Sequence, residues 1–359
     1  MGSPLGRREF SGLAFGGALA ALSAVGCSSP PAARRGPGIK ISLQLPGEFT
    51  DDDLVFVRQM GLDYVSVPTK GGTFEVFEKI KKRVEAAGLR VANIGNASVH
   101  NMPEVTLNLP GRDRKIEEYK QYLRDLSKAG LSYTTYAHMG NGIWSSERGT
   151  TRGGAPARTF NGDTARGAWD GKTFEPPLTH GRRYSPEELW DNYTYFIKQV
   201  VPVAEETGVR IGIHPDDPPV PELGGVPRCI FGSFEGYRRA LRIADSRNVG
   251  VCLCCGTWME GGSGMGCDVV GAIRAFGAMG KLWKIHFRNV SSPVPRFVET
   301  FVDDGYTDMK KVMRALVEVG FDGILIADHV PEMVGGRNPG WAYSIGYIKA
   351  LYDMAREGG

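Results

Sequence analysis

The sequence predicts an α/β protein built as one (β/α)8 barrel, the TIM-barrel architecture, with a long loop insertion after the fourth strand. Eight short runs rich in Val, Ile, Leu and aromatic residues alternate with amphipathic helical segments between residues 39 and 357. Such alternation is typical of a parallel sheet, and eight repeats favour a closed barrel over an open sheet. No glycine-rich dinucleotide motif follows any of these runs, which argues against a nicotinamide enzyme.

The expected strands are short runs of strand-forming residues that end at glycine, proline or polar residues. They span residues 39–45, 64–68, 89–94, 133–138, 209–213, 249–255, 282–288 and 323–328. The expected helices repeat apolar residues at intervals of three and four. They span residues 51–61, 73–87, 112–129, 185–207, 234–246, 268–279, 308–319 and 343–356. We expect these helices to surround the strands in a single catalytic domain, residues 39–357.

Residues 139–183 interrupt this alternation. The segment is rich in Gly, Thr and Arg, contains Trp144 and Trp169, and shows no sustained period. Long loops inside a compact domain usually act as lids or binding loops. We therefore expect this insertion to form a lid, whose arginines are candidate contacts for an anionic ligand.

The first 38 residues are expected to lie outside the barrel. Arg7 and Arg8 precede a weakly apolar run that ends at Cys27. This pattern is typical of a twin-arginine export signal followed by a lipoprotein-type cysteine. We therefore predict an export signal over residues 1–27, a lipid anchor at Cys27 and a flexible tether over residues 28–38. The predicted location is periplasmic or membrane-anchored.

The charge balance argues against a nucleic-acid partner. The formal net charge is only +3, from 43 basic and 40 acidic residues, and the sequence has no basic stripe. After the N-terminal segment, no apolar span reaches the length of a transmembrane helix. The five cysteines that follow Cys27 are an odd number and show no disulfide framework. The sequence leaves the oligomeric state open, with a homodimer as one candidate.

Residues that can bind a metal stand at the ends of the last four expected strands. His214 follows residues 209–213, Cys254 lies near the end of the next strand, and His286 and Asp328 occupy the same place in the two after that. Because barrel chemistry gathers at the C-terminal ends of strands, these four side chains are expected to converge. A lone buried His or Cys is more often structural, but four at consecutive strand ends predict a site. This donor set suits Mn²⁺, Fe²⁺, Co²⁺ or Zn²⁺, and we take Mn²⁺ or Fe²⁺ as the first candidates.

Several motifs resemble those of the mannonate dehydratases, metal-dependent barrel enzymes of hexuronate breakdown that are related in fold to xylose isomerase-like proteins. The motifs are I-H-P-D-D-P-P from Ile213, C-x-G from Cys254, H-F-R-N from His286 and the pair Asp328-His329. Ser98-Val99-His100 is similar to the P-V-H-E segment of that family, and residues 119–130 resemble its following helix. The resemblance covers most of residues 39–357.

The resemblance implies roles for individual residues. The metal ligands of the family fall on His214, Cys254, His286 and Asp328. Its cysteine lies two residues before the motif's glycine, which selects Cys254 over Cys252 and Cys255. The catalytic histidine falls on His329, and Tyr343 is the candidate for the family's catalytic tyrosine. The fourth-strand segment departs from the family pattern, with His138 and the long insertion in its place.

The implied reaction is the dehydration of D-mannonate to 2-dehydro-3-deoxy-D-gluconate. It needs a base and an acid, and His329 is the candidate for one of them and Tyr343 for the other. Arg288 is a candidate for binding the substrate carboxylate, and a salt bridge at the barrel rim is its alternative. His100 is a candidate substrate contact, and a structural role is its alternative.

Two other functions stay open at this point. One is a metal-dependent sugar isomerase or epimerase of the xylose isomerase-like class, although a thiolate ligand is unusual there. The other is an exported sugar-binding lipoprotein without catalytic activity. Hexuronate breakdown is normally internal, so the resemblance and the predicted export signal disagree.

Overall fold

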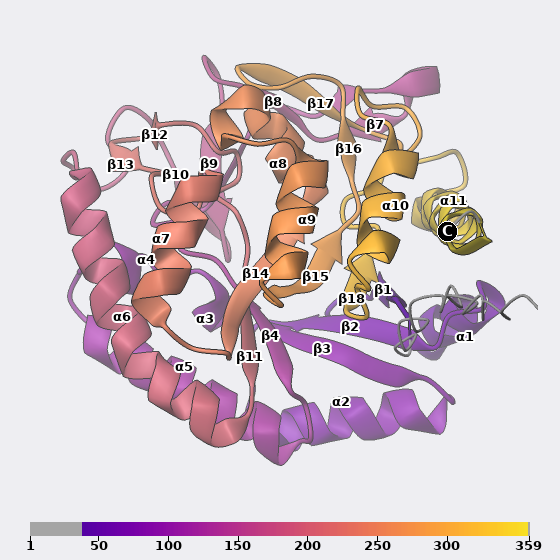
Figure 1. Ribbon diagram of the computed structural model, residues 1–359, viewed down its shortest axis with the longest axis horizontal. Coiled ribbons are helices and arrows are strands. Elements are labelled where there is room, and N and C mark those ends of the chain that lie inside the picture. Colours follow the sequence, from indigo (N-terminus) through magenta and orange to yellow (C-terminus); the bar gives the residue numbers. More distant parts are fainter. Residues whose placement is uncertain (1–37, 358–359) are drawn as a thin grey trace, which may run out of the picture. The chain divides into compact units, whose positions relative to one another are not determined.

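The computed structural model describes residues 38–357, and these residues contain the expected barrel (Figure 1). Its strands form one parallel sheet in the order β3-β2-β1-β18-β15-β14-β11-β4. They are β1 (Lys40–Gln44), β2 (Tyr64–Thr69), β3 (Arg90–Asn96), β4 (Tyr133–Tyr136), β11 (Arg210–Ile213), β14 (Val249–Cys254), β15 (Leu282–His286) and β18 (Ile324–Ile326). All eight lie where the sequence predicted strands, so the predicted fold class is confirmed.

The barrel is nearly closed, and β3 and β4, the two end members of the strand order, lie next to each other without a backbone ladder between them. A side chain joins them there. The hydroxyl of Tyr122, on helix α5 (Arg112–Lys128), donates a hydrogen bond to the carbonyl oxygen of Ile94 at 2.6 Å and lies 2.9 Å from Oγ1 of Thr134. Ile94 belongs to β3 and Thr134 to β4, so a helix residue supplies the bridge at the seam.

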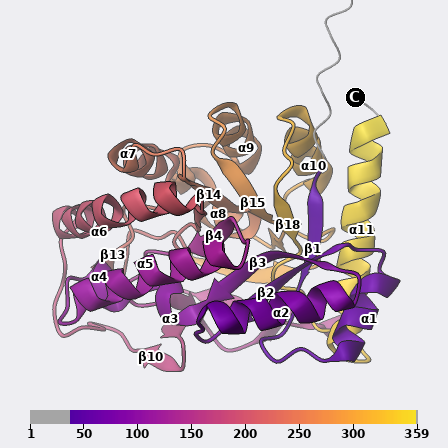
Figure 2. The same cartoon turned by 90° about the horizontal axis from the view of Figure 1, so that it is seen from below.

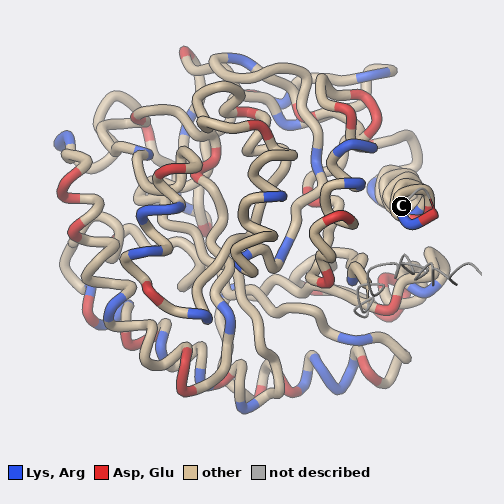
Figure 3. Tube along the Cα trace, viewed as in Figure 1, with Lys and Arg blue, Asp and Glu red and all other residues tan. Residues whose placement is uncertain are grey.

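Helices surround the sheet (Figures 1 and 2). Besides α5 they are α1 (Asp51–Gln59), α2 (Phe74–Ala86), α6 (Pro186–Thr207), α7 (Phe234–Ala244), α9 (Val269–Ala278), α10 (Met309–Glu318) and α11 (Arg337–Glu357). Ser185 caps α6, because its hydroxyl accepts from the backbone N–H of Glu188 while the Glu188 carboxylate accepts from the N–H of Ser185. Basic and acidic residues are interspersed along the outer helices (Figure 3).

Two differences from the predicted helices bear on the site. The last one begins at Arg337, earlier than expected, so Tyr343 lies inside α11 rather than at its start. A short helix, α8 (Cys255–Gly261), begins directly after β14, with Cys254 as its N-cap residue. Cys255 therefore belongs to a helix and not to the preceding strand. The segment was missed because it is too short to show a helical period.

The insertion is more regular than the sequence indicated. Strands β5 (Ile143–Ser145), β9 (Arg166–Trp169) and β10 (Lys172–Phe174) form a small antiparallel sheet, and β8 (Thr159–Asn161) pairs with β17 (Arg296–Thr300). Strands this short leave no period in the sequence, which is why the segment was predicted as a loop. The pairing of β8 with β17 fixes the insertion to the loop that follows β15.

Short elements complete the fold. They are α3 (Ala97–His100), α4 (Pro103–Thr106), β6 (Gly149–Thr150), η1 (Arg152–Gly154), β7 (Pro156–Ala157), β12 (Glu222–Leu223), β13 (Val226–Pro227), η2 (Gly262–Met265) and β16 (Asn289–Val290). The predicted export signal, Cys27 and nearly all of the predicted tether lie outside the described residues. Within residues 38–357, no helix is both long enough and apolar enough to cross a membrane.

Candidate metal centre and active site

The four predicted metal ligands meet at the C-terminal end of the barrel. His214, Cys254 and His286 each offer a buried ligand atom, and these atoms lie within 4.8 Å of one another. Asp328 joins them, with Oδ2 at 3.8 Å from Sγ of Cys254 and Oδ1 at 3.4 Å from Nδ1 of His286. The ends of β11, β14, β15 and β18 therefore bring two imidazoles, a thiol and a carboxylate to one point.

The hydrogen bonds of the two histidines leave one ring nitrogen of each available to a cation. Nδ1 of His214 donates to the carbonyl oxygen of Pro215 at 2.8 Å, which leaves the lone pair on Nε2. Nε2 of His286 lies 3.4 Å from Sγ of Cys252, while its Nδ1 is buried and has no hydrogen-bond partner among the described residues. A buried ring nitrogen without a partner, next to a thiol and a carboxylate, fits a first-row divalent metal.

The electrostatics of the site favour the metal-binding forms of three ligands. Burial lowers the pKa of both His214 and His286, so the imidazoles are neutral. Burial would raise the pKa of Asp328, but His329, His286 and Arg288 outweigh it and hold the pKa well below its usual value. Burial raises the pKa of Cys254, so this thiol would release its proton when a cation binds.

Asp328 adopts a backbone conformation that is rare for residues other than glycine. Its φ angle is 63°, in the left-handed region. The residue follows β18 at the point where the chain leaves the barrel, and this turn directs the carboxylate toward the other three ligands. Strained positions of this kind cluster at functional sites.

A cavity of about 230 Å³ opens beside the ligands. It is lined by Gln44, Ser66, Val67, Pro68, Thr69, Asn93, Gly95, Asn96, Ala97, His100, Thr135, Met139, Ile143, Trp169, His214, Asp217, Lys284, His286, Asp328 and His329. The insertion contributes three of these residues. The Trp169 ring stacks on His100 with centroids 5.1 Å apart and an interplanar angle of 22°. The insertion therefore forms part of the cavity wall, next to a predicted substrate contact.

His329 lines this cavity and is oriented by a carboxylate. Its Nδ1 lies 2.9 and 3.1 Å from the two oxygens of Glu299, and its Nε2 lies 3.9 Å from Oδ1 of Asp328. The side chain is 42% exposed, so desolvation lowers the pKa of His329 only in part, and Asp328 and Glu299 outweigh it and raise the pKa above its usual value. Nη1 of Arg288 also lies 2.7 Å from this Nδ1 and can only donate, whereas the Glu299 carboxylate can only accept. A proton on Nδ1 is therefore held by Glu299, and Nε2 is the atom that can exchange a proton in the cavity.

His100, a candidate substrate contact, lies on the cavity wall. Its Nδ1 donates to the carbonyl oxygen of Thr135 at 3.0 Å, so the lone pair is on Nε2. Burial, with a contribution from His214, lowers the pKa of His100 to about 3. The neutral ring can therefore accept a hydrogen bond from a hydroxyl group.

Arg288 does not line the cavity, and its predicted contact with a substrate carboxylate has no support in the structure. The side chain is 1% exposed. Its guanidinium lies 2.7 Å from Glu260, 2.8 Å from Glu299 and 3.1 Å from Oδ2 of Asp328. Strand β15 ends at His286, and the Arg288 side chain lies in this acidic cluster and not in the cavity. The alternative, a salt bridge, describes Arg288.

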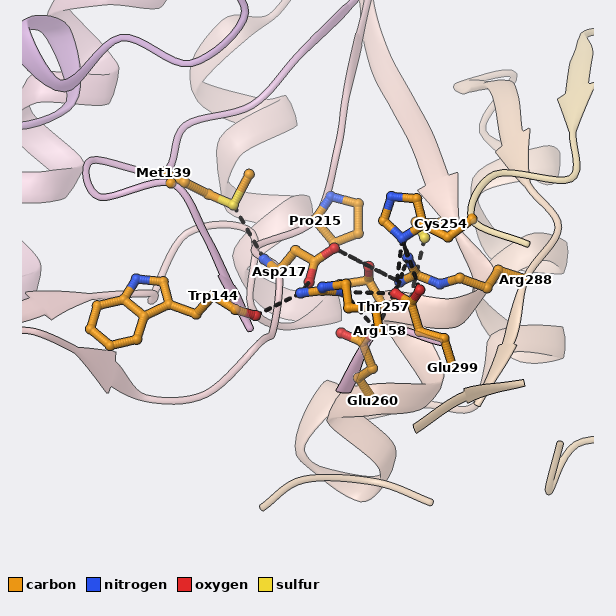
Figure 4. Close-up of polar contacts among 12 residues, drawn as sticks. Met139, Trp144, Arg158, Pro215, Asp217, Cys254, Thr257, Glu260, Arg288 and Glu299 are labelled. Carbon is orange, nitrogen blue, oxygen red and sulfur yellow. Dashed lines mark hydrogen bonds and ion pairs between the residues drawn. The ribbon is translucent and has the colours of Figure 1, made fainter. Parts of the chain in front are cut away.

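A second arginine joins the same cluster from the insertion. Arg158 lies between β7 and β8. Its guanidinium is 2.8 Å from Oδ1 of Asp217 and 2.8 Å from Oε1 of Glu299. Figure 4 shows the two guanidinium groups among Asp217, Glu260 and Glu299. These ion pairs connect the insertion to the residues that support Asp328 and His329.

Tyr343 does not lie at the cavity either. Its hydroxyl donates to Oδ2 of Asp303 at 2.7 Å and accepts from Arg152 at 3.4 Å, and the residue is 38% exposed. Because α11 begins earlier than predicted, this tyrosine lies on a helix face that packs near Arg152. The structure therefore does not place it as a partner for His329.

Sequence reasoning missed Lys284 and Asn93, which face the cavity. Nζ of Lys284 donates to Oδ1 of Asn93 at 3.0 Å. Lys284 lies two residues before His286 on β15, and alternate residues of a strand share a face. This alternation could have indicated that Lys284 faces the same side as His286. Nothing in the sequence pattern indicated a role for Asn93.

Comparisons with known proteins name one family. Residues 64–162 and 172–357 match the model of one protein family, D-mannonate dehydratase (UxuA). Mannonate dehydratase 2 of Halalkalibacterium halodurans is 31% identical over 297 residues, covering 77% of this chain and 82% of the relative. Mannonate dehydratase of Thermotoga maritima is 32% identical over 311 residues, covering 79% and 82%.

Solved structures with a similar fold include a member of the same family. A mannonate dehydratase from Streptococcus suis is 26% identical with a TM-score of 0.78, covering 90% of this chain and 95% of that protein. A xylose isomerase domain protein from Planctomyces limnophilus shares the fold at 13% identity and a TM-score of 0.58.

The comparisons contradict the predicted location. The relatives are mannonate dehydratases, and breakdown of such sugar acids is normally internal. The expectation of an exported, periplasmic or membrane-anchored protein was therefore wrong. It depended on a short N-terminal pattern, whereas the relatives match the barrel over most of its length.

Proposed function

Because the chain belongs to the D-mannonate dehydratase family, we propose that it removes water from D-mannonate to give 2-dehydro-3-deoxy-D-gluconate. The observation that carries this proposal is the convergence of His214, Cys254, His286 and Asp328 beside a cavity that also contains His329. A thiol among the donors sets this site apart from the carboxylate-rich sites expected of sugar isomerases. We further propose Mn²⁺ or Fe²⁺ as the bound cation, held by these four residues.

The reaction is difficult because the C2–H bond beside a carboxylate is weakly acidic and hydroxide is a poor leaving group. A base must take the C2 proton. The electron pair left behind forms the C2–C3 double bond as the C3–O bond breaks, and the departing hydroxyl takes a proton from an acid and leaves as water. The resulting enol then becomes the 2-keto acid. When bound, a divalent cation supplies Lewis-acid stabilisation of the negative charge that develops beside the carboxylate.

His329 is the residue that we assign to proton transfer. Its Nδ1–H is held by Glu299, and its Nε2 is on the cavity side, beside Asp328. An imidazole whose Nδ1 proton is held by a carboxylate, and whose Nε2 can gain or lose a proton, is what a general acid or base requires. The neutral ring of His100 is placed to accept a hydrogen bond from a sugar hydroxyl, while Trp169 covers it from the insertion.

The test is an activity assay on purified protein loaded with Mn²⁺ or Fe²⁺, with a chelator-treated sample as the control. A panel of aldonic acids, with D-mannonate first, is assayed for 2-keto-3-deoxy product. We expect product from D-mannonate only in the loaded sample. Interconversion of neutral sugars without any keto-deoxy acid would replace this proposal with the isomerase or epimerase alternative.

A further inference from the structure

The cavity beside the ligands contains a buried lysine with no role in the chemistry described above. Lys284 is 3% exposed and lines the cavity. Its ammonium group donates to Oδ1 of Asn93 at 3.0 Å. Within residues 38–357, no carboxylate lies within 4.0 Å of this nitrogen. An ammonium group has three N–H donors, and the neutral amide of Asn93 satisfies only one of them.

Other buried cations near this site are paired differently. Arg158 contacts the carboxylates of Asp217 and Glu299, and Arg288 contacts Glu260 and Glu299. Removing a cation from water is costly unless an anion and hydrogen bonds compensate. Lys284 has the burial without the anion. Its position on the cavity wall indicates that the missing anion comes from a bound molecule.

We propose that Lys284 binds the carboxylate of the sugar-acid substrate. This inference rests on the proposed function, and it gives Lys284 the role that the sequence suggested for Arg288. Lys284 precedes His286 by two residues on β15, so both side chains face the interior of the barrel. The carboxylate end of the substrate would then lie deeper in the barrel than His286. Its hydroxyl groups would extend toward His100 and the insertion.

The role makes a prediction about charge. A lysine that binds a carboxylate should select for anionic sugar acids and contribute nothing to the binding of an uncharged polyol. A lysine that only fills the barrel would affect both ligands equally. The comparison of D-mannonate with mannitol, which lacks the carboxylate, therefore distinguishes the two roles.

The main test is Lys284→Met in the metal-loaded protein. We expect the Kd and KM for D-mannonate to rise about 10- to 100-fold, the effect of losing a hydrogen bond between charged groups. Metal content, measured by elemental analysis, should stay at the wild-type value. Any weak binding of mannitol, measured by calorimetry, should not change. Lys281→Met is the matched control, because Lys281 lies just before the same strand and its Nζ donates to the carbonyl oxygen of Ser246.

A second variant keeps the lysine and gives its ammonium group a carboxylate partner within the protein. Asn93→Asp would place a carboxylate next to Nζ, where the amide oxygen now lies 3.0 Å away. We expect KM for D-mannonate to rise at least tenfold, because the new carboxylate competes with that of the substrate. This variant decides the question if Lys284→Met does not fold, as judged by thermal unfolding.

Two results would overturn the inference, and they are distinguishable. If both variants convert D-mannonate with a KM within twofold of the wild type, Lys284 does not bind the carboxylate and the proposed function stands. If the loaded wild-type protein converts no aldonic acid, the proposed function fails and this inference fails with it.

Discussion

The sulfur of Cys254 lies 3.8 Å from Oδ2 of Asp328, although β15 separates their two strands in the barrel. The contact spans two strand intervals because both side chains point inward at the same level. His286, at the end of the intervening β15, lies 3.4 Å from the same carboxylate group. The barrel end thus gathers donors that neighbouring strands alone would not bring together.

Cys254→Ser is expected to lower metal content, whereas Cys255→Ser is not. Cys255 begins α8 and packs in the apolar core, so its thiol serves no ligand function. Loss of residues that merely orient a ligand costs about 10- to 100-fold in metal affinity, and loss of a ligand should cost at least as much. Metal stoichiometry after dialysis against a limiting cation concentration measures the effect. Equal metal content in both variants would refute the assignment of the sulfur ligand.

His329→Gln is expected to lower kcat by about 10²- to 10⁴-fold, the usual contribution of general acid–base catalysis. The metal content should be unchanged, because Nε2 of His329 lies beside the ligand cluster without belonging to it. Tyr343→Phe is the control and should keep kcat within a few-fold of the wild type, because the tyrosine contacts Asp303 and not the cavity. A large loss of kcat in Tyr343→Phe would show that α11 moves toward the cavity during turnover.

Trp169→Ala is expected to raise the KM for D-mannonate by about 2- to 10-fold, with metal content unchanged. The ring stacks on His100, and aromatic pairs of this kind contribute about 0.5–1.5 kcal/mol. Trp169→Phe keeps an aromatic face over His100 and should stay near the wild-type KM. If steady-state kinetics give the same KM for the alanine and wild-type proteins, the insertion does not shape the substrate site.

The strands, and the convergence of the candidate ligand side chains at one end of the barrel, were predictable from the sequence because each depends on local pattern. Val, Ile and Leu runs mark the strands, and parallel strands in a barrel deliver their end residues to one rim. The sequence alone therefore predicted that His214 and Asp328 lie at the same end of the barrel. The orientation of the Arg288 side chain could not be predicted. Its partners, Glu260 and Glu299, come from α8 and β17, and neither element was predicted.

The misplacement of Tyr343 has a similar cause. Its position depends on where α11 begins, and helix starts are set by capping contacts that a sequence pattern locates only to within a few residues. Lys284 was overlooked for a different reason. In the sequence, a lysine inside a strand is typical of a residue that faces solvent. Only the three-dimensional structure shows that the face of β15 carrying Lys284 lines a cavity.

Arg158→Met is expected to destabilise the protein by about 3 kcal/mol, the lower end of the cost of breaking a buried ion pair. The guanidinium joins Asp217 and Glu299, which are almost fully buried, and its removal leaves both carboxylates short of a partner. Arg288 still lies 2.8 Å from Glu299, which is why the loss should not be larger. The free energy of unfolding from urea denaturation, at a fixed metal concentration, measures the change.

Arg148→Met is the matched control for that variant. Arg148 lies in the same insertion and pairs with Glu332 at 3.3 Å, but the side chains are 63% and 47% exposed. Solvent-exposed pairs contribute less than about 1 kcal/mol, so the free energy of unfolding should hardly change. If the two variants were equally stable, the buried cluster would not be what fastens the insertion to the barrel. A loss confined to Arg158→Met would instead show that the buried ion pairs of Arg158 stabilise the fold, whereas the exposed pair of Arg148 does not.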